Sequence, residues 1–341
     1  MTLPKFEYAQ PRSSSEACQL LEAHGGEAHA IAGGTDLIMA LKNRQKTPQM
    51  LVDLSGIPGL NQISYSDEDG LRIGALVSLR HLAANSVVRE KYPILAQAAS
   101  SVGTIQVQAM GTIAGNLCQD TCCMFFNRSA AVRQSLEPCH KLGGEVCHVV
   151  NCSEECWSTY AGDLAPALLV LRAKVKIADT QGEQVIHLRK LFSDDGVRPH
   201  TLMPGQLITE IQVPSPAPHS GGAYLKLRQR DTLDFALLGV AVNLTLEPED
   251  GICNDAAVAL TAVDSAPLVV EEADWLKGKR LTNKLILKFA KTVRDKVHPV
   301  KNLYGLTVQY RREMTAVYVE LAVQQARQSA TRFRGASCRE K

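Results

Sequence analysis

The sequence GTIAGNLCQDTCCMFFNRS (residues 111–129) opens a segment that holds seven of the ten cysteines of the chain. These are Cys118, Cys122, Cys123, Cys139, Cys147, Cys152 and Cys156. A glycine-rich turn precedes them, and an apolar run that begins near Leu164 follows them. Cysteines at this density in an otherwise ordinary globular sequence are typical of a metal or cluster site rather than of a hydrophobic core.

The composition is that of a globular protein with more than one domain. The chain has 341 residues, of which 45% are hydrophobic and 21% are charged, and a net charge of +2 gives no overall case for a nucleic-acid partner. It contains no run of 18 apolar residues, and its first residues lack the features of a signal peptide. We therefore expect a cytoplasmic protein without a membrane segment, in which thiols stay reduced and available for metal.

The first part of the chain reads as a small α/β unit, residues 1–59. A short strand is expected at Phe6–Tyr8, and Ser13 with Glu16 forms a capping box that starts a helix near Ser14. The apolar run 30–32 then leads into Gly33-Gly34-Thr35-Asp36 and a second helix. A strand, a glycine turn and a helix in this order can bind a phosphate group. The alternative is a tight turn that needs a positive φ at one of the two glycines.

Three further segments follow. We expect a second unit at 60–219, which carries the cysteine-rich loop at about 118–158 and ends at the proline-rich linker around 214–222. Residues 220–327 are predicted to form an α+β domain with strands at 223–227, 236–246 and 254–263 and helices at 284–297 and 306–325. Residues 328–341 contain few apolar side chains and are expected to be a disordered tail.

Four motifs together resemble one known family. They are Ala32-Gly33-Gly34-Thr35-Asp36, Thr112-Ile113-Ala114-Gly115-Asn116, Gly162-Asp163-Leu164-Ala165-Pro166-Ala167, and Tyr224-Leu225-Lys226 with Arg230 and Asp234. From about residue 6 to 326 the chain resembles the FAD-binding subunits of the molybdenum hydroxylases, which include xanthine dehydrogenase and carbon monoxide dehydrogenase. It departs from the family at Ala114, where a glycine is usual. The resemblance implies an α+β protein with two α/β subdomains that bind FAD and a C-terminal antiparallel sheet with helices.

The resemblance also implies which residues bind the flavin. The first turn would contribute Ala30, Ile31, Ala32, Gly33, Gly34, Thr35, Asp36 and Leu37, and the second turn Gly111, Thr112, Ile113, Gly115 and Asn116. Asp163 would bind flavin hydroxyl groups, and Lys226 would lie near the isoalloxazine edge. Without the family, Asp163 also reads as a helix N-cap and Lys226 as a solvent-facing strand residue.

Most family members have no cluster in this subunit, but the cysteine segment resembles the inserted loop of the 4-hydroxybenzoyl-CoA reductase branch, which binds a [4Fe–4S] cluster. The implied ligands are Cys123, Cys139, Cys147 and Cys156, at spacings of 16, 8 and 9 residues. Cys122 remains an alternative first ligand. Soft thiolates suit iron, whereas a zinc site completed by His140 or His148 is the structural alternative.

The function implied by the resemblance is electron transfer inside a larger enzyme, with no catalytic residue in this chain. Expected partners are a large molybdenum-cofactor subunit, a small subunit with two [2Fe–2S] clusters and a ferredoxin-like donor, in a heterotrimer that dimerises to a heterohexamer. The reaction would be reductive dehydroxylation in anaerobic aromatic degradation.

Two alternatives stay open: a xanthine dehydrogenase-like hydroxylase acting on a purine or another N-heterocycle, and a zinc-stabilised interaction protein. The basic stretch 277–296 reads as a solvated helix face or as a docking surface for an acidic partner.

Overall fold

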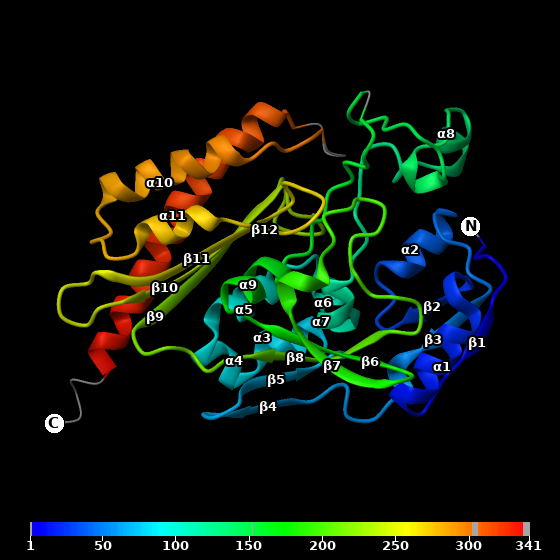
Figure 1. Ribbon diagram of the computed structural model, residues 1–341, viewed down its shortest axis with the longest axis horizontal. Coiled ribbons are helices and arrows are strands. Elements are labelled where there is room, and N and C mark those ends of the chain that lie inside the picture. Colours follow the sequence, from blue (N-terminus) through cyan, green and yellow to red (C-terminus); the bar gives the residue numbers. More distant parts are fainter. Residues whose placement is uncertain (1, 152, 302–305, 337–341) are drawn as a thin grey trace.

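The computed structural model describes residues 2–151, 153–301 and 306–336. Its strands form three separate sheets, which follow one another along the chain (Figure 1). The α+β fold class expected from the sequence is confirmed. Among the described residues, no helix has the length and apolar character that crossing a bilayer requires.

The N-terminal part is a three-stranded parallel sheet with the order β1-β3-β2. Its elements are β1 (Glu7–Ala9), α1 (Ser14–His24), β2 (Ala28–Ile31), α2 (Leu37–Lys42) and β3 (Met50–Asp53). The Ser13 hydroxyl accepts a hydrogen bond from the Glu16 amide, so α1 begins at the predicted cap. Parallel pairing brings the carboxyl end of β2, and the glycine turn after it, to the edge of the sheet that faces the middle part.

The middle part has a five-stranded sheet with the order β4-β5-β8-β6-β7, and its neighbouring strands pair antiparallel. The strands are β4 (Ile63–Ser66), β5 (Gly70–Gly74), β6 (Lys174–Asp179), β7 (Gly182–His187) and β8 (Leu207–Val213). The helices are α3 (Leu79–Ala84), α4 (Ser86–Lys91), α5 (Pro93–Ser100), α6 (Ile105–Met110), α7 (Ile113–Leu117), α8 (Ala130–Gln134) and α9 (Leu164–Val170).

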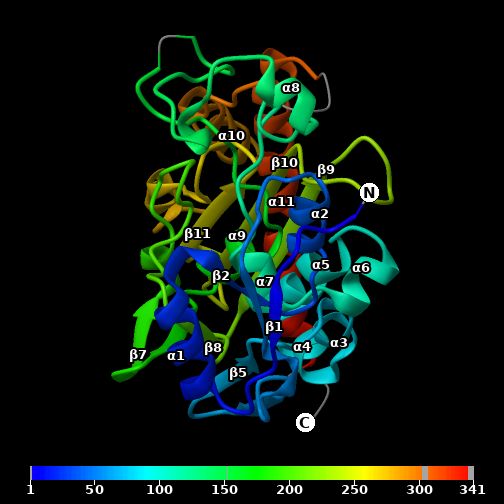
Figure 2. The same cartoon turned by 90° about the vertical axis from the view of Figure 1, so that its right-hand side faces the viewer.

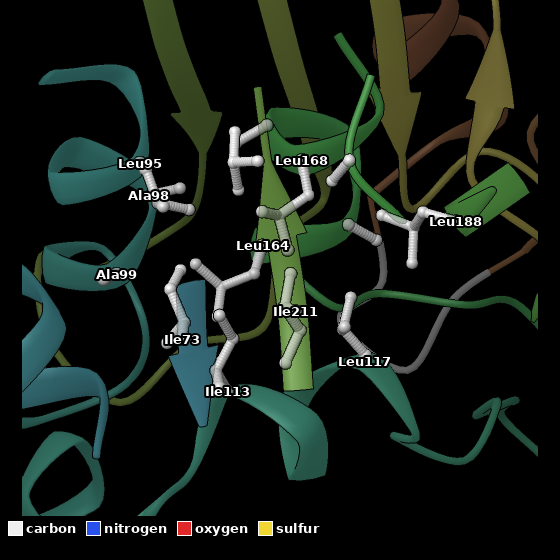
Figure 3. Packing of buried hydrophobic residues seen from close by; sticks show 14 of the residues in the cluster. Ile73, Leu95, Ala98, Ala99, Ile113, Leu117, Leu164, Leu168, Leu188 and Ile211 are labelled. Carbon is white, nitrogen blue, oxygen red and sulfur yellow. The ribbon is translucent and has the colours of Figure 1, made fainter. Parts of the chain in front are cut away.

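The largest hydrophobic core lies between this sheet and the helices that cover it (Figure 3). Ile73 from β5 and Ile211 from β8 pack against Ile113 of α7 and Leu164 of α9. Burying a side chain of this size contributes about 1.5–3 kcal/mol to stability. Because α7 and α9 are both anchored in this core, the segments at their N-termini, 111–112 and 162–163, are held in fixed positions.

The C-terminal part is a four-stranded antiparallel sheet with the order β12-β11-β10-β9, covered on one side by two helices (Figures 1 and 2). Its elements are β9 (Ser220–Leu227), β10 (Leu238–Leu246), β11 (Cys253–Thr261), β12 (Leu268–Val269), α10 (Asn283–Lys296) and α11 (Val308–Ala336). The expectation of a disordered tail from residue 328 is wrong for 328–336, because α11 continues to Ala336 with Ala330 buried. Residues 337–341 lie outside the described part of the chain.

The cysteine-rich loop stands at one end of the molecule, where α8 lies above α2 (Figures 1 and 2). Arg133 of α8 is buried, and its guanidinium group donates to the carbonyl oxygens of Asn43 and Arg44 at 2.7 and 3.1 Å, at the end of α2. The other side of the loop contacts the C-terminal part, where the Ser265 hydroxyl donates to the Cys156 carbonyl oxygen at 3.3 Å. The loop therefore joins the first and last parts of the chain.

Candidate cofactor sites

The two glycine turns predicted from the sequence contact each other. A Cβ atom added to Gly33 would lie 1.7 Å from the Met110 carbonyl oxygen, so this position has no room for a side chain. A Cβ atom added to Gly111 would lie 3.6 Å from the Thr35 Oγ1 atom. Residues far apart in the sequence thus form one continuous surface, as the expectation of a shared binding site requires.

The first turn offers backbone donors. Gly34 has a φ of 68°, the left-handed conformation that favours glycine, and Gly33 does not. Within the described part of the chain, the amide groups of Gly33, Gly34 and Thr35 have no acceptor. They lie just before the N-terminus of α2, where the helix dipole favours negative charge. Of the predicted flavin residues, Ala30 and Ile31 end β2, residues 32–36 form the turn, and Leu37 begins α2.

The backbone amides of the second turn, unlike those of the first, are hydrogen-bonded within the protein. Thr112 is the N-cap of α7, and its side chain accepts from the Gly115 amide at 3.1 Å. The amides of Ile113 and Ala114 donate to Val77 and Ala75, and that of Asn116 donates to Thr112. Since these donors are already engaged, the second turn supports the first turn rather than adding a second row of free amides. The Gly111 carbonyl accepts from the Leu79 amide and ties the turn to α3.

Asp163 and Lys226, predicted separately, form a buried ion pair. The Lys226 Nζ atom lies 3.0 Å from Asp163 Oδ2, and the two side chains are 3% and 5% exposed. Tyr224 donates its hydroxyl to Asp163 Oδ1 at 2.6 Å. Burial raises the pKa of the Asp163 carboxyl, an effect that the Lys226 charge opposes. Asp163 occupies the N-cap position of α9, as the alternative interpretation expected, but its side chain makes no capping hydrogen bond. Lys226 does not face solvent, so the alternative for that residue is wrong. Direct contact of Asp163 and Lys226 with a flavin stays a prediction.

Asn116 has a structural role, because it makes hydrogen bonds to two neighbouring segments. Its Oδ1 atom accepts from the Leu164 amide at 3.0 Å, and its carbonyl oxygen accepts from the Tyr160 hydroxyl at 3.1 Å. This residue therefore locks the second turn to the start of α9, next to Asp163. The sequence assigned no role to Tyr160, and it placed Tyr224 in a family motif without a role, because a tyrosine among apolar residues reads as core.

The four predicted cluster ligands line one cavity in the loop. Its wall consists of Cys123, Phe125, Phe126, Cys139, His140, Lys141, Val146, Cys147, His148, Val149, Cys156 and Ser158. Cys122 instead forms an antiparallel bridge with Thr159, with two backbone hydrogen bonds of 2.9 Å. Cys118 packs against the large core, and Cys152 lies outside the described residues. The arrangement favours Cys123 over Cys122 as the first ligand.

Two of these four sulfur atoms accept a hydrogen bond from the backbone amide three residues further along. The Phe126 amide donates to Cys123 Sγ at 3.2 Å, and the Val150 amide donates to Cys147 Sγ at 3.5 Å. Burial raises the pKa of the Cys139 and Cys156 thiols, and nearby backbone amides, those of Lys141 and Leu142 for Cys139 and that of Ser158 for Cys156, oppose this effect. Hydrogen bonds to sulfur stabilise the thiolate form and help to set the potential of an iron–sulfur cluster.

The two histidines of the zinc alternative also line this cavity, but one ring nitrogen of each is bonded to a backbone carbonyl oxygen. A ring nitrogen of His140 bonds the Ser153 carbonyl oxygen at 3.2 Å, and one of His148 bonds the Glu137 carbonyl oxygen at 2.7 Å. In the described residues, no three His, Cys, Asp or Glu side chains converge closely enough to hold a single metal ion.

A network of charged side chains lies between the first glycine turn and the cysteine cavity. Asp120 accepts from Lys141 at 2.8 Å and lies 3.6 Å from Lys46. Burial and then the Asp120 charge raise the pKa of the Asp36 carboxyl, and the Asp120 amide opposes this effect. His29 and His200 are close to Lys46 and Asp120, and the Nδ1 atom of each is buried without a partner in the described part of the structure.

The basic stretch 277–296 is partly paired. Lys277 forms ion pairs with Asp255 and Asp274, and Lys288 lies over the Trp275 ring at 5.2 Å. Lys284 and Lys291 are exposed on α10. Most of this surface is a solvated helix face; docking of an acidic partner stays a prediction.

Comparisons with known proteins agree with this geometry. The family model described as FAD binding domain in molybdopterin dehydrogenase matches residues 4–216, and that of the CO dehydrogenase flavoprotein C-terminal domain matches residues 223–326. The chain is 34% identical over 284 residues to the aldehyde oxidoreductase FAD-binding subunit PaoB of Escherichia coli, covering 79% of this chain and 85% of that one.

Two further relatives are CO dehydrogenases. The medium chain from Afipia carboxidovorans is 29% identical over 327 residues, covering 95% of this chain and 98% of that one. The solved structure of the enzyme from Hydrogenophaga pseudoflava matches with a TM-score of 0.79 and 26% identity, covering 96% of this chain and 98% of that one.

Proposed function

Because this chain belongs to the family of FAD-binding medium subunits of the molybdenum hydroxylases, we propose that it is an electron-transfer subunit that holds FAD and one [4Fe–4S] cluster. It is a flavoprotein subunit of an oxidoreductase, and its FAD-binding domain spans most of the chain. The cluster, the ligands and the reaction of the whole enzyme are the parts that we propose.

The first glycine turn suits the pyrophosphate of FAD. No acceptor among the described residues binds the amides of Gly33, Gly34 and Thr35, so these amides can donate to a phosphate, and the positive end of the α2 dipole adds to them. We propose that the second turn, with Gly111, Thr112, Gly115 and Asn116, supports the first turn and keeps it in position. Asp163 and Lys226 would fix the position of β9 against α9, beside the isoalloxazine ring. The unpartnered Nδ1 atoms of His29 and His200 are candidates for contacts with the remaining polar groups of FAD.

The cluster proposal is carried by one observation: Cys123, Cys139, Cys147 and Cys156 line a single cavity, and the sulfur atoms of Cys123 and Cys147 accept hydrogen bonds from backbone amides. In a [4Fe–4S] cluster each thiolate binds a different iron, so the ligands surround a cavity, whereas the ligands of one zinc ion converge on a point. When bound, FAD and the cluster would carry electrons between an external donor, which we propose is ferredoxin-like, and the partner subunits.

The partners are proposed from the relatives. Those named medium chains imply a larger and a smaller subunit, and we assign to these the molybdenum cofactor and two [2Fe–2S] clusters, in a heterotrimer that dimerises. We place the complex in the cytoplasm, which suits the eight free cysteines of the described residues. We also retain the domain limits at 59 and 219, between which the second of the three sheets lies.

Two reactions of the whole enzyme are supported. The cysteine spacing favours reductive removal of the phenolic hydroxyl of 4-hydroxybenzoyl-CoA. Relatives named for nicotinate, caffeine and nicotine favour a hydroxylase that acts on a purine or another N-heterocycle. Both reactions use the same flavin subunit, and purification of the native complex followed by assay of each reaction separates them. A zinc-stabilised interaction protein without a redox role does not fit an oxidoreductase family.

Cysteine substitutions test the cluster directly. Serine at Cys123, Cys139, Cys147 or Cys156 is expected to lower the iron and acid-labile sulfide content from about four each per chain, because every iron needs its thiolate. Cys122→Ser is the matched control: it replaces the adjacent thiol, which does not line the cavity. A wild-type chain without iron, or a Cys122→Ser chain that loses it, would contradict the assignment.

A further inference from the structure

Lys141 is a buried cation in the wall of the cysteine cavity. It follows the proposed ligand Cys139 by two residues, and only 4% of its side chain is exposed. Its ammonium group donates to Asp120 Oδ1 and to the Thr121 carbonyl oxygen, each at 2.8 Å. It also lies 4.8 Å from the centre of the Phe126 ring, a favourable cation–π distance. These contacts hold the charge at a fixed place beside the cavity.

Pairing with Asp120 alone does not account for this lysine. Lysine is rarely buried because the charge loses its hydration, and a buried ion pair commonly gives little net stability. Asp120 already has a second cation at 3.6 Å, Lys46, whose side chain is 35% exposed. Two lysines therefore share one carboxylate, and the buried one is on the side of the cysteines. The other acidic group of the network, Asp36, belongs to the first glycine turn, and the Asp120 charge raises the pKa of its carboxyl.

We propose that the ammonium group of Lys141 raises the reduction potential of the [4Fe–4S] cluster held by Cys123, Cys139, Cys147 and Cys156. This inference rests on the cluster assignment made above. Taking up one electron from an external donor adds one negative charge to the cluster. A nearby cation stabilises that added charge, and burial keeps water and salt from screening the attraction. Asp120 holds the cation in place and partly offsets it.

Four substitutions separate this effect from a general disturbance of the loop. Lys141→Met removes the charge but keeps an unbranched side chain, and Lys141→Arg keeps the charge. Lys46→Met removes the other cation of Asp120, which does not line the cavity, and is the matched control. Asp120→Asn removes the opposing negative charge and is expected to shift the potential in the opposite direction.

The experiment is a redox titration of the full chain loaded with iron and sulfide, followed by the electron paramagnetic resonance signal of the reduced cluster. We expect Lys141→Met to lower the midpoint potential by at least about 59 mV, a tenfold change in the one-electron equilibrium. Lys141→Arg is expected to stay near the wild type, Asp120→Asn to rise, and Lys46→Met to change less than Lys141→Met. Iron content is measured for each protein.

An unchanged potential in an iron-loaded Lys141→Met protein overturns the inference. If Lys141→Met loses its iron, the Asp120→Asn protein is the deciding variant. An unchanged or lower midpoint potential in Asp120→Asn then also overturns the inference. A wild-type chain that binds no iron overturns the cluster assignment itself and the inference with it. The two failures are therefore distinguished by the iron content of the wild type.

Discussion

Replacing Gly33 with alanine should separate the two glycine turns and weaken FAD binding. The new Cβ atom would lie 1.7 Å from the carbonyl oxygen of Met110 and 2.5 Å from its carbonyl carbon. Both are backbone atoms, so no change of rotamer relieves the clash. The turns must move apart by about 1.7 Å before the Cβ reaches 3.4 Å from the oxygen, where ordinary contact begins.

The cost of this movement can be estimated from overpacked cores. Inserting one methyl group into a tightly packed place costs about 1–3 kcal/mol, and an immobile backbone neighbour puts Gly33 at the upper end. If the turns separate in the free protein, FAD must bring them together again at that cost. A loss of about 3 kcal/mol corresponds to roughly 150-fold weaker binding.

The assay is fluorescence titration of flavin-free protein with FAD, together with flavin content after desalting. Two nearby glycines are controls. Gly26→Ala meets no atom within 4 Å and should bind FAD as the wild type does. Gly34→Ala must adopt a φ of 68° but touches only side-chain atoms, of which the nearest is Ile38 Cγ1 at 3.1 Å, so its loss should be intermediate, about 1–2 kcal/mol. Wild-type affinity in a folded Gly33→Ala protein would refute the contact between the turns as the basis of the site.

Three other predictions concern the charged residues that hold the fold together. Lys226→Met leaves the Asp163 carboxylate buried without its cation, so we expect a loss of about 3–5 kcal/mol in urea unfolding, with Asp163→Asn in the same chain restoring part of it. The Arg230 guanidinium lies 2.6 Å from the carboxylate of the buried Asp234 and lowers the pKa of that carboxyl. The ion pair therefore stabilises the folded protein fully above the pKa of an unfolded aspartate, about 3.9, and this stabilisation is lost as the pH falls through the lower pKa of the folded state. Asp234→Asn should thus lower the Tm at pH 6 but not at about pH 2, and an equal Tm difference at both would contradict this. Arg133→Met removes the bonds from α8 to the end of α2, so limited proteolysis should cut residues 128–157 faster than in the exposed control Arg128→Met; equal rates would show that the loop is held by other contacts.

The local elements were predictable because their signals are short-range. Ser13 before a periodic apolar run predicts the start of α1, and glycines between a strand and a helix predict the turn at 33–36. Alternating apolar residues predict β9, β10 and β11 to within a few residues. The expectation for the tail was wrong because composition gives little weight to a small side chain: Ala330 is buried in the core of the C-terminal part.

The contacts between distant segments were not predictable in the same way. Spacing cannot choose between Cys122 and Cys123, which are adjacent. The structure separates them because Cys122 pairs with Thr159 in extended backbone, where successive side chains point to opposite sides, and Cys123 then faces the cavity. Lys141 and Lys226 resemble solvated lysines in the sequence, since nothing local shows that Asp120 and Asp163 lie beside them.

The bridge between Cys122 and Thr159 brings the two ends of the cysteine-rich loop side by side. The chain leaves and re-enters the body of the protein at neighbouring points. We therefore expect that residues 123–158 can be exchanged for a two-residue hairpin turn with α7 and α9 in place, at the loss of the contacts that Arg133 makes with the end of α2 and Cys156 makes with Ser265. The entropy of closing a loop grows only slowly with its length, and insertion at such a point therefore costs little stability. Under the proposed assignment of a cluster to this loop, a flavoprotein of this architecture could acquire or discard an additional electron carrier as one segment, and the same junction would be a place to graft a designed redox module onto a relative that lacks one.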